Sequence, residues 1–513
     1  TFTQSGLLCA VLKMIEAPEA CAVFGDEVTL HAQAGANLAF RPDFSLDYLL
    51  TCPSATSRNW LFNREKALTV GGFDPDHAQA IELDLILRMI EDAGFTEFAH
   101  SSEPMIIAPM WQAQDNYDQA RTVQRHLHTR GYAGSQVHAL ELGHYRIDYG
   151  HVDQPLVSIL VTSHDTLETL LPCVESILEN TAYSFYEILI CDNNSQSAQT
   201  REWLANIDSM QSERIRVIRH EQTLSPSALL NSAAAHALGD YLLMLDSHAL
   251  IIQPEWLDHL LNHAQRPEVG VVGAKLVSTD GNVVQAGIIV GLNGTAAPVT
   301  ASDIATSASD VQRLETDQNY SAVSGSCLMI RKSVHEQVQG LDEHLFPLHF
   351  NDVDLCLKAR STGHLVVWTP HAIVALRPND ALFDAEALDF ATRALSHRWL
   401  HYMAWDPAYN RNLDLSKSFA PLSNPELSWR PLTHRPLPVV LAQPCNHGVA
   451  GNRISAVVQN LRTECKVDGV ISHTPLPFVE IARLSPDAVV IQGPVNDSLI
   501  ASINAIKDHT NAR

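Results

Sequence analysis

Residues 241–248 read Tyr-Leu-Leu-Met-Leu-Asp-Ser-His, an apolar run of strand length that stops at a carboxylate and places an imidazole two positions later. Side chains two positions apart in an extended segment point to the same side, so Asp246 and His248 can converge on one ion. In open α/β sheets, ligands bind at the carboxyl ends of buried strands. The alternative is a strand followed by a polar turn, and these eight residues alone do not decide between the two.

Strands and helices alternate in the sequence that leads up to this run. Apolar runs predict strands at 157–161, 186–190, 215–218 and 241–245, and helical spacing predicts helices at 167–178, 200–207 and 227–238. Strands that alternate with helices form parallel β-α-β units, with helices on both faces of the sheet. The sequence therefore predicts a Rossmann-like α/β domain.

Polar side chains follow three of these strands. Ser163 comes after the first strand, Asp192 after the second, and Asp246 with His248 after a later one. The carboxyl ends of parallel strands share one edge, so we expect these side chains to line a single crevice. Taken alone, Asp192 is better explained as an Asx turn or a helix cap. The recurrence at three strand ends favours one site.

The pair of Asp246 and His248 suits a divalent cation that bridges two phosphates. Such an ion would neutralise the charge that develops on a nucleoside-diphosphate leaving group, which is Lewis-acid catalysis. A carboxylate together with an imidazole suits Mn²⁺ better than Mg²⁺ or Ca²⁺, which prefer oxygen ligands only.

A second acidic position lies further along the chain, at Asp352 and Asp354, in a segment with helical spacing. A carboxylate near the start of a helix is stabilised by unpaired amides, so capping the helix accounts for one of the two acids. The other acid is free to act as a general base toward an acceptor hydroxyl.

The composition is that of an ordinary globular protein. Of its 513 residues, 46% are hydrophobic and 18% are charged, and this length suggests about three domains. The net charge of −24 argues against nucleic acid or an anionic membrane surface as a partner. Nine scattered cysteines without a C-x-x-C pattern favour reduced thiols in a cytoplasmic protein. No apolar stretch reaches the roughly 18 residues that span a bilayer.

Two parts of the chain share a motif. Gly71-Gly72-Phe73-Asp74 precedes an acidic helical segment that contains Glu82, and Gly340-Leu341-Asp342 precedes the one that contains Asp352. The first block therefore looks like the second half of a domain that the middle of the chain contains whole. The sequence also looks like a piece cut from a longer polypeptide at both ends. We predict a truncated domain at 1–115, a helical connector at 116–154, a complete domain at 155–380, a helical and proline-rich linker at 381–436, and a partial Rossmann-like domain at 437–513.

Residues 155–375 resemble a glycosyltransferase family 2 domain of the GT-A fold, the Rossmann-like fold of nucleotide-diphospho-sugar transferases. Each short motif is weak evidence, but their order along the chain is specific. The motifs lie at 157–163, 187–193, 200–204, 224–231, 245–248, 254–257, 272–276, 280–281, 325–331, 350–356 and 367–370.

The resemblance implies a role for each candidate residue. The donor would be a UDP- or dTDP-linked sugar and the acceptor a hydroxyl of a glycan or glycoprotein, with inversion at the anomeric carbon and Mn²⁺ (or Mg²⁺) as cofactor. Surface polysaccharide or surface glycoprotein synthesis would place the protein in the cytoplasm or peripherally at the inner membrane. By this resemblance the nucleotide would be bound by Ser163, Asp192, Asn231 and Asp246, the metal by Asp246 and His248, and the acceptor or sugar by Gly325, Asn351 and Trp368, with Asp352 as the catalytic base.

The sequence departs from the family pattern around the metal. The family usually has an acidic residue where His248 stands, although an Asp-Ser-His sequence is similar to the polypeptide N-acetylgalactosaminyltransferases, which use the histidine as a manganese ligand. Many relatives carry a further histidine where this chain has Leu376, which cannot bind a metal. His371 is a candidate substitute, and a surface histidine is the better-supported interpretation of it.

The flanking blocks also carry a resemblance. The first block resembles the acceptor half of an upstream family 2 domain, with Glu82 at the position of the base and without a nucleotide-binding half. The last block resembles the opening of a GT-B-type glycosyltransferase, with Gly448 and Gly451 after its first strand. The altered metal position and the partial flanking blocks leave a second hypothesis open, a catalytically inactive GT-A-like domain that binds glycan or protein.

Overall fold

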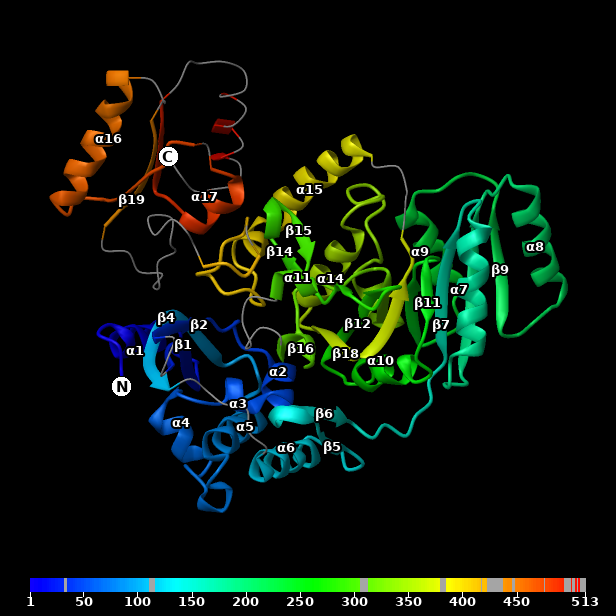
Figure 1. Ribbon diagram of the computed structural model, residues 1–513, viewed down its shortest axis with the longest axis horizontal. Coiled ribbons are helices and arrows are strands. Elements are labelled where there is room, and N and C mark those ends of the chain that lie inside the picture. The colour runs from blue at the N-terminus through cyan, green and yellow to red at the C-terminus, as the bar shows by residue number, and fades with distance from the viewer. Residues whose placement is uncertain are drawn as a thin grey trace.

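A computed structural model of the chain shows three blocks that each contain a sheet (Figure 1). In Figure 1 the first block is blue, the central domain runs from cyan to yellow, and the last block is orange and red. The structure describes residues 1–31, 35–109, 116–304, 312–378, 384–416, 418–421, 437–444, 448–474, 476–492, 500, 503–504 and 506–507.

A mixed ten-stranded sheet forms the core of the central domain. Its first four strands run parallel to one another, as the sequence predicts: β7 (Val157–Ser163), β8 (Tyr186–Asn193), β9 (Ile215–His220) and β10 (Tyr241–Leu245). The antiparallel β17 (Cys327–Arg331) joins β10 to the second half, which contains β12 (Val269–Ser278), β18 (Leu365–Leu376) and β11 (Ala249–Ile251). The order of the strands in the sheet is β11-β18-β12-β17-β10-β7-β8-β9. In addition, β13 (Val283–Gln285) pairs with β12, and β16 (Gln318–Asn319) pairs with β18. The predicted α/β fold is confirmed.

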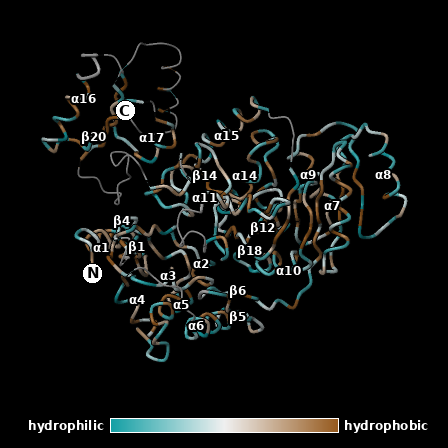
Figure 2. The backbone as a smooth tube through the Cα atoms, viewed as in Figure 1, coloured by the Kyte–Doolittle hydropathy of each residue, from teal (hydrophilic) through white to brown (hydrophobic). Residues whose placement is uncertain are grey.

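Helices cover both faces of this sheet because its strands are apolar on both sides. All five residues of β10 are buried. Figure 2 shows brown, apolar segments along the strands and teal segments along outer helices and loops. One face packs against α7 (Leu167–Glu179), α8 (Ala198–Ser209) and α10 (Trp256–Ala264), and the other against α9 (Pro226–His236), α14 (Asn351–Ser361) and α15 (Ala385–Ala404).

The segment after residue 380 contributes to the same core. In α15, Ala391 and Leu395 belong to the hydrophobic cluster of the central domain, together with Leu413 and Phe419. The predicted domain boundaries stay predictions, but residues 385–416, 418 and 419 pack as part of the central domain. Smaller elements of this domain are β14 (Ile288–Val290), β15 (Ala296–Pro298), α11 (Ala301–Ile304), α13 (Lys332–Gln337), and the short helices η3 (Leu292–Gly294) and η4 (Gln312–Leu314).

The first block is built around β1 (Ala22–His31). This strand pairs antiparallel with β2 (Gly35–Ala39) and β3 (Leu61–Phe62) and parallel with β4 (Phe98–Pro109). A connector containing α6 (Tyr117–Thr129) and the hairpin of β5 (Gln136–Ala139) and β6 (Tyr145–Asp148) follows. The helices of the block are α1 (Gly6–Glu16), α2 (Leu46–Thr51), α3 (Pro53–Thr56), α4 (Arg64–Thr69) and α5 (Ile81–Ala93), and short helices occur at η1 (Pro75–His77) and η2 (Glu141–Gly143).

The first block repeats the second half of the central domain strand by strand. β12 has two antiparallel partners and one parallel partner, β13, β17 and β18, just as β1 has β2, β3 and β4. The helices that follow match as well. Asp84 in α5 is fully buried and bonds Arg125 of α6 at 2.9 Å, and Asp354 in α14 is fully buried and bonds Arg398 of α15 at 2.9 Å. The similarity read from two short motifs therefore extends to the topology.

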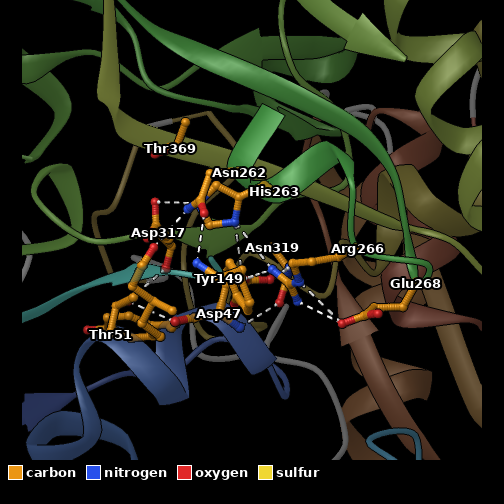
Figure 3. A network of polar contacts seen from close by, with 12 residues as sticks. Asp47, Thr51, Tyr149, Asn262, His263, Arg266, Glu268, Asp317, Asn319 and Thr369 are labelled. Carbon is orange, nitrogen blue, oxygen red and sulfur yellow. Dashed lines mark hydrogen bonds and ion pairs between the residues drawn. The ribbon is translucent and has the colours of Figure 1, made fainter. Parts of the chain in front are cut away.

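A buried polar network fixes the first block to the central domain (Figure 3). Asp47 of α2 and Arg266, which follows α10, form an ion pair in which both side chains are 1% exposed. The other oxygen of Asp47 accepts a hydrogen bond from Asn319 at 2.5 Å, and Arg266 also bonds Glu268 at 3.1 Å. His263 lies 3.4 Å from Asp317 in the same network.

The last block is a small parallel sheet. Its strands have the order β20-β19-β21, with β19 (Val439–Gln443), β20 (Asp468–Ile471) and β21 (Ala488–Ile491) beside the helices α16 (Gly448–Thr463) and α17 (Phe478–Leu484). Gly448 and Gly451 lie in the first turn of α16 instead of in a loop. The Rossmann-like start is present, and its GT-B character stays a prediction. Among the helices of the described residues, none is long and apolar enough to cross a membrane.

Candidate active site

Asp246 and His248 touch each other at the end of β10. Asp246 Oδ1 accepts a hydrogen bond from the backbone N–H of His248 at 2.9 Å and lies 2.9 Å from His248 Nδ1. The Asp246 side chain is 32% exposed and that of His248 is 17% exposed. The strand ends here because the chain turns, with the Ala249 N–H donating to the Asp246 carbonyl. Both side chains therefore point to the same side and remain open to solvent.

Asp352 begins α14 in a half-buried position. Its carboxylate accepts hydrogen bonds from the N–H groups of Gly325 and Val353, both at 2.8 Å. Burial raises the pKa of Asp352, and the bond from Gly325 opposes this shift. A carboxyl with a raised pKa is a stronger base when it is ionised.

Asp354 holds the fold instead. It accepts hydrogen bonds from Arg398 at 2.9 Å and from the Trp399 indole at 2.8 Å, and it lies 3.3 Å from Lys358. The sequence left open which of the two acids is free. Because Asp354 is fully buried among these partners, Asp352 is the acid that remains for chemistry.

One turn connects the two acidic positions. The backbone N–H of Asp246 donates to the Ser326 carbonyl at 3.0 Å, and the neighbouring Gly325 donates to Asp352. A Cβ atom on Gly325 would lie 3.1 Å from the Asp352 Cβ atom, so any larger residue would press on this carboxylate. The turn at 324–326 thus brings the end of β10 and the start of α14 together, although they are about a hundred residues apart in sequence.

Ser163 and Asp192 lie side by side on β7 and β8, as register partners. Asp192 accepts a hydrogen bond from the Ser195 N–H at 3.2 Å, which is the turn that the sequence offered as an alternative. The buried Ser163 Oγ atom has no hydrogen-bond partner within the described part of the chain. A buried hydroxyl without a partner is costly, so this atom is available to a ligand.

Asn193, which carried no separate role in the sequence analysis, shapes the same edge of the sheet. Its side chain exchanges two hydrogen bonds with the backbone of Leu224, at 3.0 and 2.8 Å. These bonds hold the segment before α9 against the end of β8. The sequence Asp192-Asn193-Asn194 carries no local signal for this role, because the partner Leu224 is thirty-one residues away.

Asn231 does not join this group. Its amide donates to the Leu341 carbonyl at 2.9 Å and to Glu343 at 2.8 Å, and it accepts from the Leu341 N–H at 2.9 Å. Both of its donors are therefore used to hold the turn at Gly340, and a direct nucleotide contact is not supported. Asn351 is also used internally, since it donates to Ser227 Oγ at 3.0 Å and anchors α14 to α9.

Trp368 cannot contact an acceptor. Its side chain is 0% exposed, and its indole N–H donates to the Ala274 carbonyl inside the core. The predicted role as an acceptor or sugar contact is wrong because β18 is covered on the face that carries this residue. Whether a strand residue is covered depends on tertiary packing, which the local sequence does not encode.

His371 and Leu376 both lie on β18. His371 lies five residues before Leu376, and its ring packs 6.1 Å from that of His259. His371 is half-buried, so it is not a surface histidine, and its role as a substitute ligand stays a prediction. Leu376 pairs with Ala249 of β11 and packs against the hydrophobic core. One residue further along, the Arg377 N–H donates to the His248 carbonyl at 3.0 Å.

Arg377 was missed by the sequence analysis. Residues that pair directly across two strands share a face of the sheet, so Arg377 lies on the face of His248, whereas Leu376 lies on the opposite one. Its guanidinium donates to the Glu168 carbonyl at the start of α7. In the described residues, no group of three or more His, Cys, Asp or Glu side chains is arranged to hold a metal. The candidate site at the end of β10 therefore contains Asp246 and His248, with the backbone of Arg377 bonded to that of His248.

Comparison with known proteins finds a family model that matches part of the central domain. The sequence profile of the family described as Glycosyl transferase family 2 matches residues 158–339. The uncharacterized protein y4gI of Sinorhizobium fredii (strain NBRC 101917 / NGR234) is 33% identical over 441 residues, which are 82% of this chain and 48% of that protein. The O-antigen biosynthesis protein RfbC of Myxococcus xanthus is 30% identical over 442 residues, 81% of this chain and 33% of that protein. The chain thus spans half or less of these curated relatives.

A solved structure aligns with the chain more loosely. The crystal structure of GalNAc-T7 with UDP, GalNAc and Mn²⁺ has a TM-score of 0.42 and 16% identity, and the alignment covers 52% of each chain.

Proposed function

We propose that the chain transfers a sugar from a UDP- or dTDP-linked donor to a hydroxyl of a glycan or glycoprotein. The support is that residues 158–339 are a glycosyl transferase family 2 domain with an α/β, GT-A-like fold. The transfer uses a divalent cation, Mn²⁺ or Mg²⁺, and inverts the anomeric carbon. The name of the Myxococcus xanthus relative supports a place in polysaccharide synthesis. A cytoplasmic or peripheral inner-membrane location belongs to the same proposal.

The observation that carries the proposal is the turn at 324–326. Two consecutive residues of this turn contact the two positions: the Ser326 carbonyl accepts from the Asp246 N–H at the end of β10, and the Gly325 N–H donates to the base candidate Asp352 in the first turn of α14. A transferase needs its leaving-group site and its base on opposite sides of one sugar, and a shared turn provides that proximity.

In the proposed reaction, Asp352 accepts the proton of the acceptor hydroxyl while the hydroxyl oxygen attacks the anomeric carbon. A new C–O bond forms, the bond from the anomeric carbon to the diphosphate breaks, and the nucleoside diphosphate leaves. Ser163 and Asp192 hold the base of the nucleotide. Asn231 acts indirectly, because it fixes the turn at Gly340 that leads toward α14.

The residues at the end of β10 fit a divalent cation. A carboxylate and an imidazole that converge on one side are ligands that Mn²⁺ accepts, and the other positions of its shell are left to phosphate oxygens and water. When bound, such an ion supplies charge neutralisation to the diphosphate. Asp246 and His248 would hold it.

Arg377 is expected to contact the diphosphate as well. We expect Arg377→Gln to raise the KM for the donor about tenfold and to leave the fold intact, since a hydrogen bond to a charged group contributes about 1.5–3 kcal/mol. Initial rates at varied donor concentration measure this. Arg201→Gln, at an exposed position of α8, serves as the matched control, and an equal KM in both variants would contradict the role.

The reaction should require the ionised form of Asp352. Because burial raises the pKa of this group, the fraction of active base falls as the pH falls through the raised value. We expect kcat/KM to increase with pH and to level off above the ordinary pKa range of aspartate. A profile of kcat/KM between pH 4 and 9 measures this, and a profile that is already flat near pH 4 would exclude a buried carboxyl as the base.

A second candidate function is a catalytically inactive domain that binds glycan or protein. The two-residue metal pair, with Leu376 packed into the core, favours it. A panel of UDP- and dTDP-sugars, incubated with the chain and Mn²⁺ and analysed for nucleoside diphosphate, separates the two. Release of diphosphate from at least one donor supports the transferase, and release from none supports the binding domain.

A further inference from the structure

The first block contains a cavity of about 340 Å³. Its walls come from the end of β2, from α2 and α3 with the residues around them, and, on the side of the central domain, from Arg313, Asn410, Leu413, Phe419 and Pro421. The central-domain site lies on other elements, β7, β8, β10 and α14, so this cavity is separate from it.

The internal repeat places this cavity beside a counterpart of the catalytic base. The Asn59 N–H donates to Glu82 at 2.9 Å, as the Gly325 N–H donates to Asp352 at 2.8 Å. Asn59 and Gly325 each stand two residues before the matching strands β3 and β17. The Asn59 side chain also bonds Glu27 at 2.8 Å, and Glu27 is held by two arginines that line the cavity. In the central domain we propose that the acceptor binds beside Asp352. The cavity therefore lies at the corresponding place in the first block, near Glu82.

Aromatic rings form one wall of the cavity. Phe24 and Trp60 stack with their ring centroids 4.6 Å apart, and Phe44 meets Trp60 edge-on at 6.3 Å. Tyr48 and Phe40 also line the space. Flat aromatic faces bury the C–H faces of sugar rings by the same apolar and quadrupolar forces that join aromatic pairs.

Charged groups also line the cavity, and each has a partner within the protein. Arg41 and Arg58 both pair with Glu27, which is 1% exposed. Asp43 pairs with His100 at 2.8 Å. The guanidinium groups can donate hydrogen bonds to the hydroxyls of a sugar. The buried Arg58 Nε atom has no hydrogen-bond partner in the described residues, so the lining of the cavity holds an unused donor.

The central domain completes the cavity. Asn410 donates to both carboxylate oxygens of Asp26 at 2.8 and 2.9 Å and to the Arg41 carbonyl at 2.7 Å. Leu413 and Phe419 then cover the space from the same segment. The first block by itself would leave this side open.

We propose that this cavity binds a saccharide, one unit of a glycan chain. The block repeats the half-domain that carries Asp352 in the central domain, and its cavity adds aromatic rings and hydrogen-bond donors. Binding here would hold a glycan on the same molecule as the central site. The proposal does not depend on the activity of the central domain.

Saturation-transfer NMR on the whole chain tests the proposal, with methyl glycosides of glucose, galactose, mannose, rhamnose and N-acetylglucosamine as probes. Ala39 lines the cavity and is half-buried, so Ala39→Trp fills the space without removing a polar contact. Ala36 is exposed on the same strand and does not line the cavity, so Ala36→Trp is the matched control.

We expect at least one glycoside to give a signal with the wild type and with Ala36→Trp, and that signal to be lost with Ala39→Trp. Excess UDP and the substitution Asp246→Ala should leave the signal unchanged. No signal from the wild type, a signal that survives Ala39→Trp, or one that UDP or Asp246→Ala removes would each overturn the proposal. The last result would assign the saccharide to the central domain instead.

Discussion

Asp352→Asn is expected to lower the kcat of sugar transfer by about 10²–10⁴-fold, the usual contribution of a positioned general base. The amide has the shape of the carboxyl and can still accept the hydrogen bond from the Gly325 N–H, so the turn at 324–326 is retained. It cannot take the proton of an acceptor hydroxyl. The loss should therefore fall on kcat, and the affinity for the nucleoside diphosphate should change little.

Product formation by mass spectrometry and nucleotide binding by calorimetry together measure this result. Asp280→Asn is the matched control, because Asp280 is an exposed aspartate held only by its own turn. Its activity should equal that of the wild type. A kcat for Asp352→Asn within a factor of about three of the wild type would exclude Asp352 as the base.

The second large effect concerns stability. Asp47→Ala should lower the free energy of unfolding by about 3–5 kcal/mol, the range observed when one partner of a buried ion pair is removed. Arg266 is 1% exposed and would lose its closest ion pair inside the junction between the first block and the central domain, although it would keep the ion pair with Glu268. Asn319 would lose its acceptor as well. Unfolding in urea, followed by tryptophan fluorescence, measures the change.

Two further variants make that measurement specific. The double substitution of Asp47→Ala with Arg266→Met removes both charges and should recover much of the loss, because no unpaired charge remains buried. Asp389→Ala breaks an exposed ion pair on α15, with side chains 65% and 74% exposed, and should change stability by less than about 1 kcal/mol. Equal losses in Asp47→Ala and Asp389→Ala would show that the network in Figure 3 does not hold the blocks together.

The strands and the local parts of the site were predictable from sequence. The apolar runs at 157–161 and 241–245 became β7 and β10 with ends shifted by two residues or fewer. The placement of Asp246 and His248 at a strand end, and of Asp352 near a helix start, could be read from the sequence. The two-residue period of a strand and the first turn of a helix fix the direction in which these side chains point. Such features are set by neighbours in the chain.

Features that depend on distant partners were not predictable. Trp368 is covered by packing, and the amide of Asn231 is taken by a turn more than a hundred residues away. The contribution of Arg377 depends on the register between β11 and β18. The cavity of the first block is closed by residues 410–421, which lie more than three hundred residues beyond its aromatic wall. Register and long-range closure carry no local signature.

We propose that the end of β10 forms the metal and leaving-group site of a sugar transferase. The most direct measurement is the Mn²⁺-dependent release of nucleoside diphosphate from a panel of UDP- and dTDP-sugars by the wild type and by Asp246→Ala. We expect the wild type to release diphosphate from at least one donor only when Mn²⁺ is present, and Asp246→Ala to release it at least about a hundredfold more slowly. Equal release by the two proteins would contradict the claim.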